Sequence, residues 1–194
     1  MERAPLSKNA VIAAAADLAD REGFDAVSVS ALARQFGVQP ASLYSHVRDR
    51  AAVLAGVHEL ALAGLADVVA EQTAGRAGRD ALAGLADAHA GYAREHPGRW
   101  GALQRPASPQ TAGSEGAVRL VALIFAVLRA YALPDDELVH ATRFVGAAIN
   151  GFLALDRAES FAHRATGSDE SWRRTVDALD RSLRTWPGSE GESA

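Results

Sequence analysis

The residues of this sequence whose types and spacing could do chemistry are concentrated in a short stretch after Gly37. They are Ser42, Tyr44, Ser45, His46, Arg48 and Arg50. Hydroxyl, imidazole and guanidinium groups placed this closely suit three kinds of chemistry: nucleophilic catalysis, metal binding, and contacts with the bases and phosphates of a nucleic acid. The rest of the sequence has to decide among the three.

The other parts that a catalytic or metal site needs are missing from the sequence. It contains no cysteine, which excludes a thiolate metal site, and it has no Gly-x-Ser-x-Gly run and no Gly-rich phosphate loop. Glu137 and His140 form one Glu-x-x-His unit, which di-iron carboxylate bundles use twice. A solvated pair is the favoured interpretation. We therefore expect no catalytic residue, no metal and no cofactor, with a di-metal helical-bundle enzyme as one alternative.

Composition indicates a helical protein with one small basic region. Of the 194 residues, 48% are hydrophobic, mainly Ala and Leu, and 6% are aromatic, which favours helix over strand. The net charge is −4, yet residues 34–50 carry three arginines against one aspartate. The N-terminus has no apolar signal-peptide core, and no twenty-residue apolar span is apparent. We expect a cytoplasmic protein with no membrane partner.

Helical periodicity and helix-stop residues predict an all-α fold of about nine helices. Ser7 and Ser28 are suited to cap the first two helices, and Asp49 to cap a long connecting helix over 49–72. Residues 106–116, rich in Pro, Ser and Gly, are expected to form an exposed loop. The helix over 117–132 is apolar almost all round and should be the central buried helix. The other later helices are expected over 81–96, 97–105, 134–159 and 169–186.

The chemistry-bearing stretch fits a helix-turn-helix. Gly37 suits the left-handed end of one short helix, and Pro40 suits the first turn of the next, whose inward positions are Leu43 and Val47. The outer face of that second helix then carries small polar and aromatic groups, as in a helix that enters the DNA major groove. Double-stranded operator DNA is the expected partner, and a helical adaptor that binds no DNA is the remaining alternative.

Side-chain chemistry assigns roles within this stretch. Gln39 and Ser42 suit base edges, Ala41 a thymine methyl, and Tyr44, His46 and Arg50 phosphates. Less specific interpretations stay open: the ring of Tyr44 could pack under the motif, His46 could be a solvated helix end, and Arg50 could pair with Asp49. Arg34 is more simply a solvated charge. The full set of DNA-binding candidates is Ser28, Ser30, Gln39, Pro40, Ala41, Ser42, Tyr44, Ser45, His46 and Arg50.

The stretch "LARQFGVQPASLYSHVRDRAAVL", preceded by "AADLADREGFDAVSVSALA", resembles the N-terminal DNA-binding region of TetR-type transcriptional regulators over about residues 8–60. Val47 stands where many members have Phe, and Arg50 stands where Lys is usual. Val29 occupies a position that is often a hydroxyl residue, so a phosphate contact is missing there. "REHPGRW" and "AAINGFLALDRAESF" are similar to a TetR subgroup with a C-terminal His-Gly pair, with Asn150 in place of the His.

The resemblance implies a two-part regulator: a DNA-binding head over 1–50, a ligand-binding and dimerising body over 51–186, and a disordered tail over 187–194. It further implies a homodimer that binds a palindromic operator and is released by an unknown small molecule. The last two long helices are the expected dimer surface. Its predicted apolar residues are Leu138, Phe144, Val145, Ala148, Phe152, Trp172, Val176, Leu179 and Leu183. Polar or aromatic groups on apolar helices give the ligand-binding candidates His58, His89, Tyr92, Trp100, Phe125 and Asn150, for each of which ordinary core packing is equally compatible.

Overall fold

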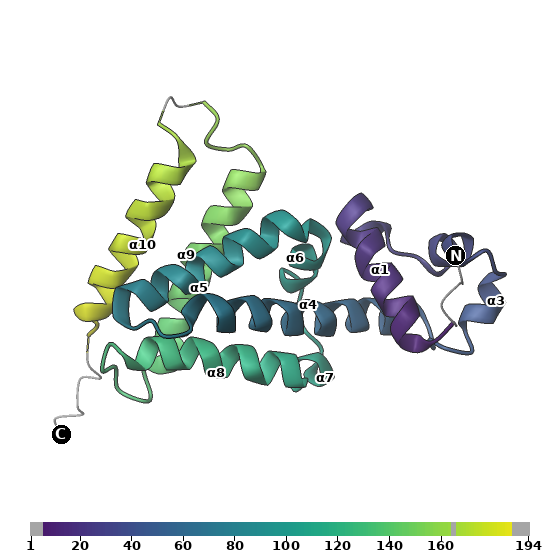
Figure 1. Ribbon diagram of the computed structural model, residues 1–194, viewed down its shortest axis with the longest axis horizontal. Coiled ribbons are helices and arrows are strands. Elements are labelled where there is room, and N and C mark those ends of the chain that lie inside the picture. Colours follow the sequence, from purple (N-terminus) through teal and green to yellow (C-terminus); the bar gives the residue numbers. More distant parts are fainter. Residues whose placement is uncertain (1–5, 164–165, 188–194) are drawn as a thin grey trace, which may run out of the picture. The chain divides into compact units, whose positions relative to one another are not determined.

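A computed structural model describes residues 6–163 and 166–187, and in this part of the chain it contains ten α-helices, one 3₁₀ turn and no strand (Figure 1). The all-α expectation is confirmed. The elements are α1 (Lys8–Glu22), η1 (Phe24–Ala26), α2 (Val29–Phe36), α3 (Pro40–Leu43), α4 (Arg50–Thr73), α5 (Gly78–Glu95), α6 (Pro97–Leu103), α7 (Pro109–Ala112), α8 (Glu115–Arg129), α9 (Leu138–Arg157) and α10 (Ser168–Arg184).

The helix ends of the N-terminal region form as the sequence predicts. The Ser7 and Ser28 side chains accept hydrogen bonds from the N–H groups of Ala10 and Ala31, each at 3.2 Å. Gly37 ends α2 with a φ of 66°, a left-handed conformation that costs glycine little. The Asp49 carboxylate accepts from the Ala52 N–H at 2.7 Å and thereby caps α4.

Apolar side chains from α1, α2, α3 and the first turns of α4 share one core. Its largest members, each almost inaccessible to solvent, are Val11, Val27, Leu32, Leu43, Val53 and Val57. Leu43 and Val47 face this core, as predicted, and Ala102 of α6 joins it. The core therefore fixes the orientation of the short α3, which at four residues is too short to be stable alone.

The contacts divide the chain into two compact units. The first comprises residues 1–66 and 92–119, and the second comprises 67–91 and 120–194. Three helices, α4, α5 and α8, contribute residues to both units. This grouping follows contacts rather than function, so the division at residue 50 stays a prediction. The expected disordered tail lies, except for Pro187, outside the described residues.

Within the first unit, the N-terminus of α6 docks closely on α1. The Asp20 carboxylate accepts hydrogen bonds from the N–H groups of Gly98 and Arg99 at 3.0 and 2.8 Å, so α1 caps α6 in place of a residue of α6 itself. The Arg99 guanidinium pairs with Asp20 at 3.1 Å and with Asp17 at 2.6 Å. The Nδ1 atom of His96 lies 3.3 Å from the same Asp20 carboxylate. We call these five residues the α1–α6 lock.

Two expectations about the later helices are wrong. The expected loop over 106–116 contains α7, because Ser108 caps a helical turn, accepting from the Thr111 N–H at 3.1 Å, and Thr111 is buried. The expected central helix, α8, is not buried all round: Val118 is 59% and Val121 44% exposed. An apolar helix surface needs a partner but does not reveal whether that partner belongs to the same chain.

Most of the apolar residues predicted for the dimer surface do not lie on an outer face of the chain. Leu138 and Val145 of α9 are buried within the chain, as are Val176, Leu179 and Leu183 of α10. Phe152 packs on Trp172 with ring centroids 5.1 Å apart, which also joins α9 to α10 inside the second unit. Only Phe144, at 39%, is clearly exposed, while Ala148 is half-buried. The sequence pattern does not distinguish the face that packs within the chain from the face left outside.

Two helices, α4 and α9, are long and apolar enough to cross a membrane by length and composition alone, contrary to the expectation that no such span exists. In α4 this composition serves the protein interior, since Val53, Val57, Ala61 and Leu65 are buried. In α9 the row from Leu138 to Leu153 at helical spacing is buried in the same way. Length and hydropathy do not separate a core helix from a membrane helix.

Gly98 provides a test of the α6–α1 contact. A Cβ atom at this position would overlap the backbone carbonyl of Ala19, so Gly98→Ala has to push α6 away from α1. We expect the substitution to destabilise the protein by about 1–3 kcal/mol, measured by urea unfolding. Gly101→Ala on the same helix is the control: its Cβ would meet only Phe24 Cβ at 3.7 Å, so stability should stay equal or rise. Equal effects of the two substitutions would contradict the close contact.

Candidate nucleic-acid interface

The structure brings the predicted recognition residues together on one exposed surface. Because Leu43 and Val47 are held in the core, the opposite side of α3 faces solvent. The His46 and Val47 N–H groups donate to the Leu43 carbonyl at 2.9 and 3.0 Å, which continues the turn beyond Leu43, and the Ser45 hydroxyl donates to the Ser42 carbonyl at 2.8 Å. The exposed residues of this segment are Gln39, Pro40, Ala41, Ser42, Tyr44 and Ser45, with His46 half-buried, and Ser30 of α2 is exposed as well.

The ring of Tyr44 is not packed under the motif. Its residue is 54% exposed, so the ring as well as the hydroxyl is accessible to a partner. Ser28, by contrast, is half-buried and its hydroxyl already caps α2. Of the hydroxyl candidates, Ser42, Tyr44 and Ser45 are thus better placed than Ser28 for contacts with DNA.

Arg50 has a structural partner that the sequence did not indicate. Its Nε atom donates to the Val27 carbonyl at 2.6 Å and its Nη2 atom donates to the Asp25 carbonyl at 2.9 Å. The side chain thereby ties the start of α4 to the connection between α1 and α2. The alternative of an Arg50–Asp49 pair is wrong, because Arg48 pairs with Asp49 at 2.9 Å. The Nη1 atom of Arg50 donates to neither of these carbonyls and would be left for a phosphate.

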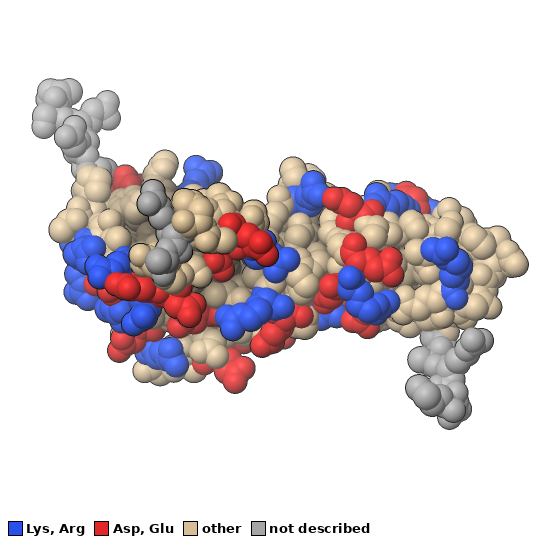
Figure 2. All heavy atoms as spheres, turned by 90° about the horizontal axis from the view of Figure 1, so that it is seen from above, with Lys and Arg blue, Asp and Glu red and all other residues tan. Residues whose placement is uncertain are grey.

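Arg48 is the exposed cation that the candidate set omitted. Its side chain is 83% exposed. Its partner Asp49 also accepts the hydrogen bond from the Ala52 N–H that caps α4. That backbone hydrogen bond, followed by the Arg48 hydrogen bond, lowers the pKa of Asp49. In Figure 2, Lys and Arg are interspersed with Asp and Glu over the visible face rather than gathered in one basic patch. Arg48 is therefore a further cation that is accessible to a DNA phosphate.

The six ligand-binding candidates divide between the two units. His58, Tyr92 and Trp100 lie in the first unit, whereas His89, Phe125 and Asn150 lie in the second. Two of them have side-chain partners on their own helix: Asn150 Nδ2 donates to the Gly146 carbonyl at 2.9 Å, and His89 Nδ1 lies 2.8 Å from the Leu85 carbonyl. Phe125 is half-buried. The candidates thus do not form a single cluster within either unit.

His58 and Tyr92 are buried polar groups of the first unit. Burial lowers the pKa of His58, so its ring is neutral near pH 7. Burial likewise raises the pKa of Tyr92 to about 12. The Tyr92 hydroxyl is buried without a hydrogen-bond partner among the described residues, and it approaches α4 at Gly64, where a Cβ would lie 3.0 Å from it. An unsatisfied buried hydroxyl is costly, which makes it a candidate for binding a ligand atom.

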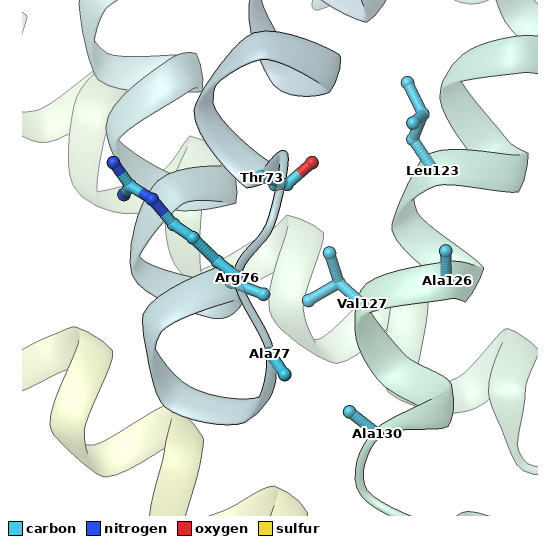
Figure 3. Close-up of a pocket in the computed structure, with 8 residues that line it drawn as sticks. Thr73, Arg76, Ala77, Leu123, Ala126, Val127 and Ala130 are labelled. Atoms are coloured by element: carbon cyan, nitrogen blue, oxygen red, sulfur yellow. The ribbon is translucent and has the colours of Figure 1, made fainter.

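A small pocket of about 140 Å³ lies within the second unit. Figure 3 shows Leu123, Ala126 and Val127 of α8, with Ala130 just after it, on one side, and Thr73 and Ala77 on the other. The Thr73 hydroxyl donates to the Val69 carbonyl at 2.7 Å. The lining is therefore mainly apolar, and it includes none of the six predicted ligand-binding residues.

The groups named for metal chemistry do not gather. Glu137 accepts a hydrogen bond from the Trp186 indole at 2.9 Å, while His140 is exposed. Among the described residues, no three His, Asp or Glu side chains lie close enough together to hold a metal ion. The Glu137 carboxylate instead joins the start of α9 to Trp186, two residues after the end of α10.

Comparison with known families matches both parts of the chain. Residues 11–57 match the family described as bacterial regulatory proteins, tetR family, and residues 82–179 match the tetracyclin repressor-like C-terminal domain. The chain belongs to the TetR family. It is an all-α, DNA-binding transcriptional regulator. The matched residues 11–57 include the segment in which the sequence predicts the helix-turn-helix. The narrower resemblance to the His-Gly subgroup is not confirmed.

Individual relatives agree with this assignment. The HTH-type transcriptional regulator Rv0681 of Mycobacterium tuberculosis is 33% identical over 79% of this chain and 71% of its own length. The HTH-type regulator YobS of Bacillus subtilis is 29% identical over 95% of this chain and 92% of its own. Among solved structures, a TetR variant from Acinetobacter baumannii in complex with minocycline is 26% identical, with a TM-score of 0.69 and coverage of 95% of this chain and 100% of that one.

Arg50 can be tested for its two roles separately. Arg50→Ala removes both carbonyl contacts, so we expect the thermal midpoint to fall by roughly 3–6 °C. Arg48→Ala is the matched control and should leave the midpoint unchanged, because its partner is the neighbouring, exposed Asp49. If Nη1 of Arg50 also contacts a phosphate, the slope of log K against log salt for DNA binding should become shallower by about two units per dimer. An unchanged midpoint in Arg50→Ala would contradict the structural role.

Proposed function

We propose that this TetR-family regulator is a cytoplasmic homodimeric repressor that binds a palindromic operator and releases it when a small molecule binds its body. The observation that carries the proposal is the exposed polar surface of residues 39–46 above the buried Leu43 and Val47. Gln39 and Ser42 read base edges, Ala41 approaches a thymine methyl, and Tyr44 and His46 contact phosphates. Ser30 and Ser45 supply further exposed hydroxyls for DNA.

Dimerisation follows from the size of a single head, because one short recognition helix makes too few contacts for a specific site. A two-fold dimer presents two such helices to half-sites one helical turn apart, roughly 34 Å, which requires a palindromic operator. The outer face of α9 is the proposed interface. It exposes Val139, Phe144 and Leu155, with the small residues Ala147 and Gly151 between them, which would let a second helix approach closely.

The effector site is proposed around Tyr92 in the first unit. Its unsatisfied hydroxyl is a group that a ligand oxygen or nitrogen could satisfy, and the buried His58 lies in the same unit. The relative from Acinetobacter baumannii holds minocycline, which supports a small-molecule effector in this chain too. Its chemical identity does not follow from these residues.

The α1–α6 lock is the proposed route from effector to head. The Tyr92 ring packs on His96 with centroids 4.9 Å apart, and His96 lies beside Asp20. A ligand that moves Tyr92 would therefore disturb the group that holds α6 on α1. A coupling of about 3 kcal/mol between the two sites would change DNA affinity roughly a hundredfold.

The proposal is tested by a gel shift against the DNA upstream of the protein's own gene, combined with sedimentation. Phe144→Glu places a charge in the proposed interface and should yield monomers with at least about tenfold weaker operator binding. Val118→Glu on α8 is the control, since Val118 is even more exposed and lies outside the interface, and it should leave both readouts unchanged. The opposite pattern would assign the interface to α8, and no shift with wild type would reject this operator.

A further inference from the structure

A groove beside the recognition segment has the size and lining of a small-molecule site. Its volume is about 530 Å³, within the range of drug-sized ligand pockets. It lies wholly in the first unit and is bounded by the start of α1, by residues 46–48, by two turns of α4 and by the start of α7. It contains none of the six residues named as ligand-binding candidates.

The floor of the groove is formed by small residues of α4. Ala52, Ala55 and Gly56 line it, and α1 crosses close by, where a Cβ at Gly56 would overlap the Ile12 side chain. Pro109 of α7 adds a further apolar surface. The space beside Gly56 is filled by Ile12, whereas Ala52 and Ala55 carry only short side chains, so a flat apolar group can lie along their part of the floor.

The rim of the groove carries two cationic side chains, Lys8 and Arg48, and one carboxylate, Glu59. The imidazole of His46 also lines it. Lys8 is exposed and makes no ion pair among the described residues, and Arg48 pairs only with the exposed Asp49. These charges favour a ligand with an anionic group near Lys8 and Arg48.

We propose that this groove binds an amphipathic organic anion, with a carboxylate, sulfonate or phosphate at the Lys8–Arg48 rim and an apolar body over Ala52 and Ala55. His46 and Arg48 belong to the surface that faces DNA phosphates, so the same ligand excludes DNA by direct competition. The competition rests on the proposed DNA contacts, whereas the site itself does not. It is separate from the Tyr92 site, which would act through α6.

The experiment uses anilinonaphthalene sulfonate, a fluorescent amphipathic anion, with the full-length protein. Lys8→Glu reverses the rim charge at a position where glutamate suits the first turn of α1, so folding is retained. For Lys8→Glu we expect the dye concentration at half-saturation, the binding midpoint, to rise by about three- to tenfold. Arg21→Glu, the same charge change at the far end of α1 and outside the groove, should leave the midpoint unchanged. Equal midpoints for both variants, or no binding by wild type, would overturn the proposal.

A second measurement locates the probe, because the dye also binds other apolar surfaces. The sequence has no cysteine, so Gln110→Cys places a single thiol on the α7 wall of the groove. Saturating dye should slow its reaction with N-ethylmaleimide about threefold or more, but should not slow that of Ala13→Cys on the exposed side of α1. Equal protection at both positions would overturn the site. Displacement of the dye by random duplex DNA would support competition between ligand and DNA. If DNA does not displace the dye, the competition is refuted, while the binding site itself is still judged by the thiol protection.

Discussion

The carboxylate of Asp20 is the group on which the arrangement of the first unit most depends. It accepts two backbone N–H groups at the start of α6, pairs with Arg99 and lies beside His96. Those N–H groups would otherwise be unsatisfied at a helix end. Separating α6 from α1 would therefore break all four interactions of Asp20 at once: the two hydrogen bonds, the ion pair and the contact with His96. Gly98 makes the contact possible because any side chain there would meet the backbone of α1. A displacement of α6 therefore moves α1 or breaks the lock.

The head is small, and side-chain hydrogen bonds as well as its core hold the start of α4 in place. Arg50 holds the start of α4 to the carbonyls of Asp25 and Val27, while Asp49 caps the same helix. Together they fix the last part of the recognition segment between α3 and α4. Contacts of this kind limit the backbone conformations next to the exposed residues, which reduces the entropy lost on binding.

Local sequence signals predicted the head well, and non-local contacts limited the prediction elsewhere. Helix ends depend on neighbours within a few residues, so a local sequence pattern predicts them. Examples are the caps of Ser7, Ser28 and Asp49 and the left-handed Gly37. The bond of Arg50 to Val27 spans 23 residues, and the lock between Asp20 and α6 spans 78, so no local pattern indicates them. Likewise, α9 is apolar on several faces, and only tertiary packing reveals that Val145 is inside and Phe144 outside.

Whether residues 39–46 read DNA sequence is tested most directly by selecting binding sites from randomised duplexes with wild type and with Ser42→Ala. Ser42 is exposed on α3 opposite the buried Leu43, where its hydroxyl can reach a base edge. Wild type should select a palindrome, and Ser42→Ala should change preference at one symmetric pair of positions by about 1 kcal/mol or more, leaving the others as they were. An unchanged selection profile, or a uniform loss of affinity for all sequences, would contradict base readout by this residue.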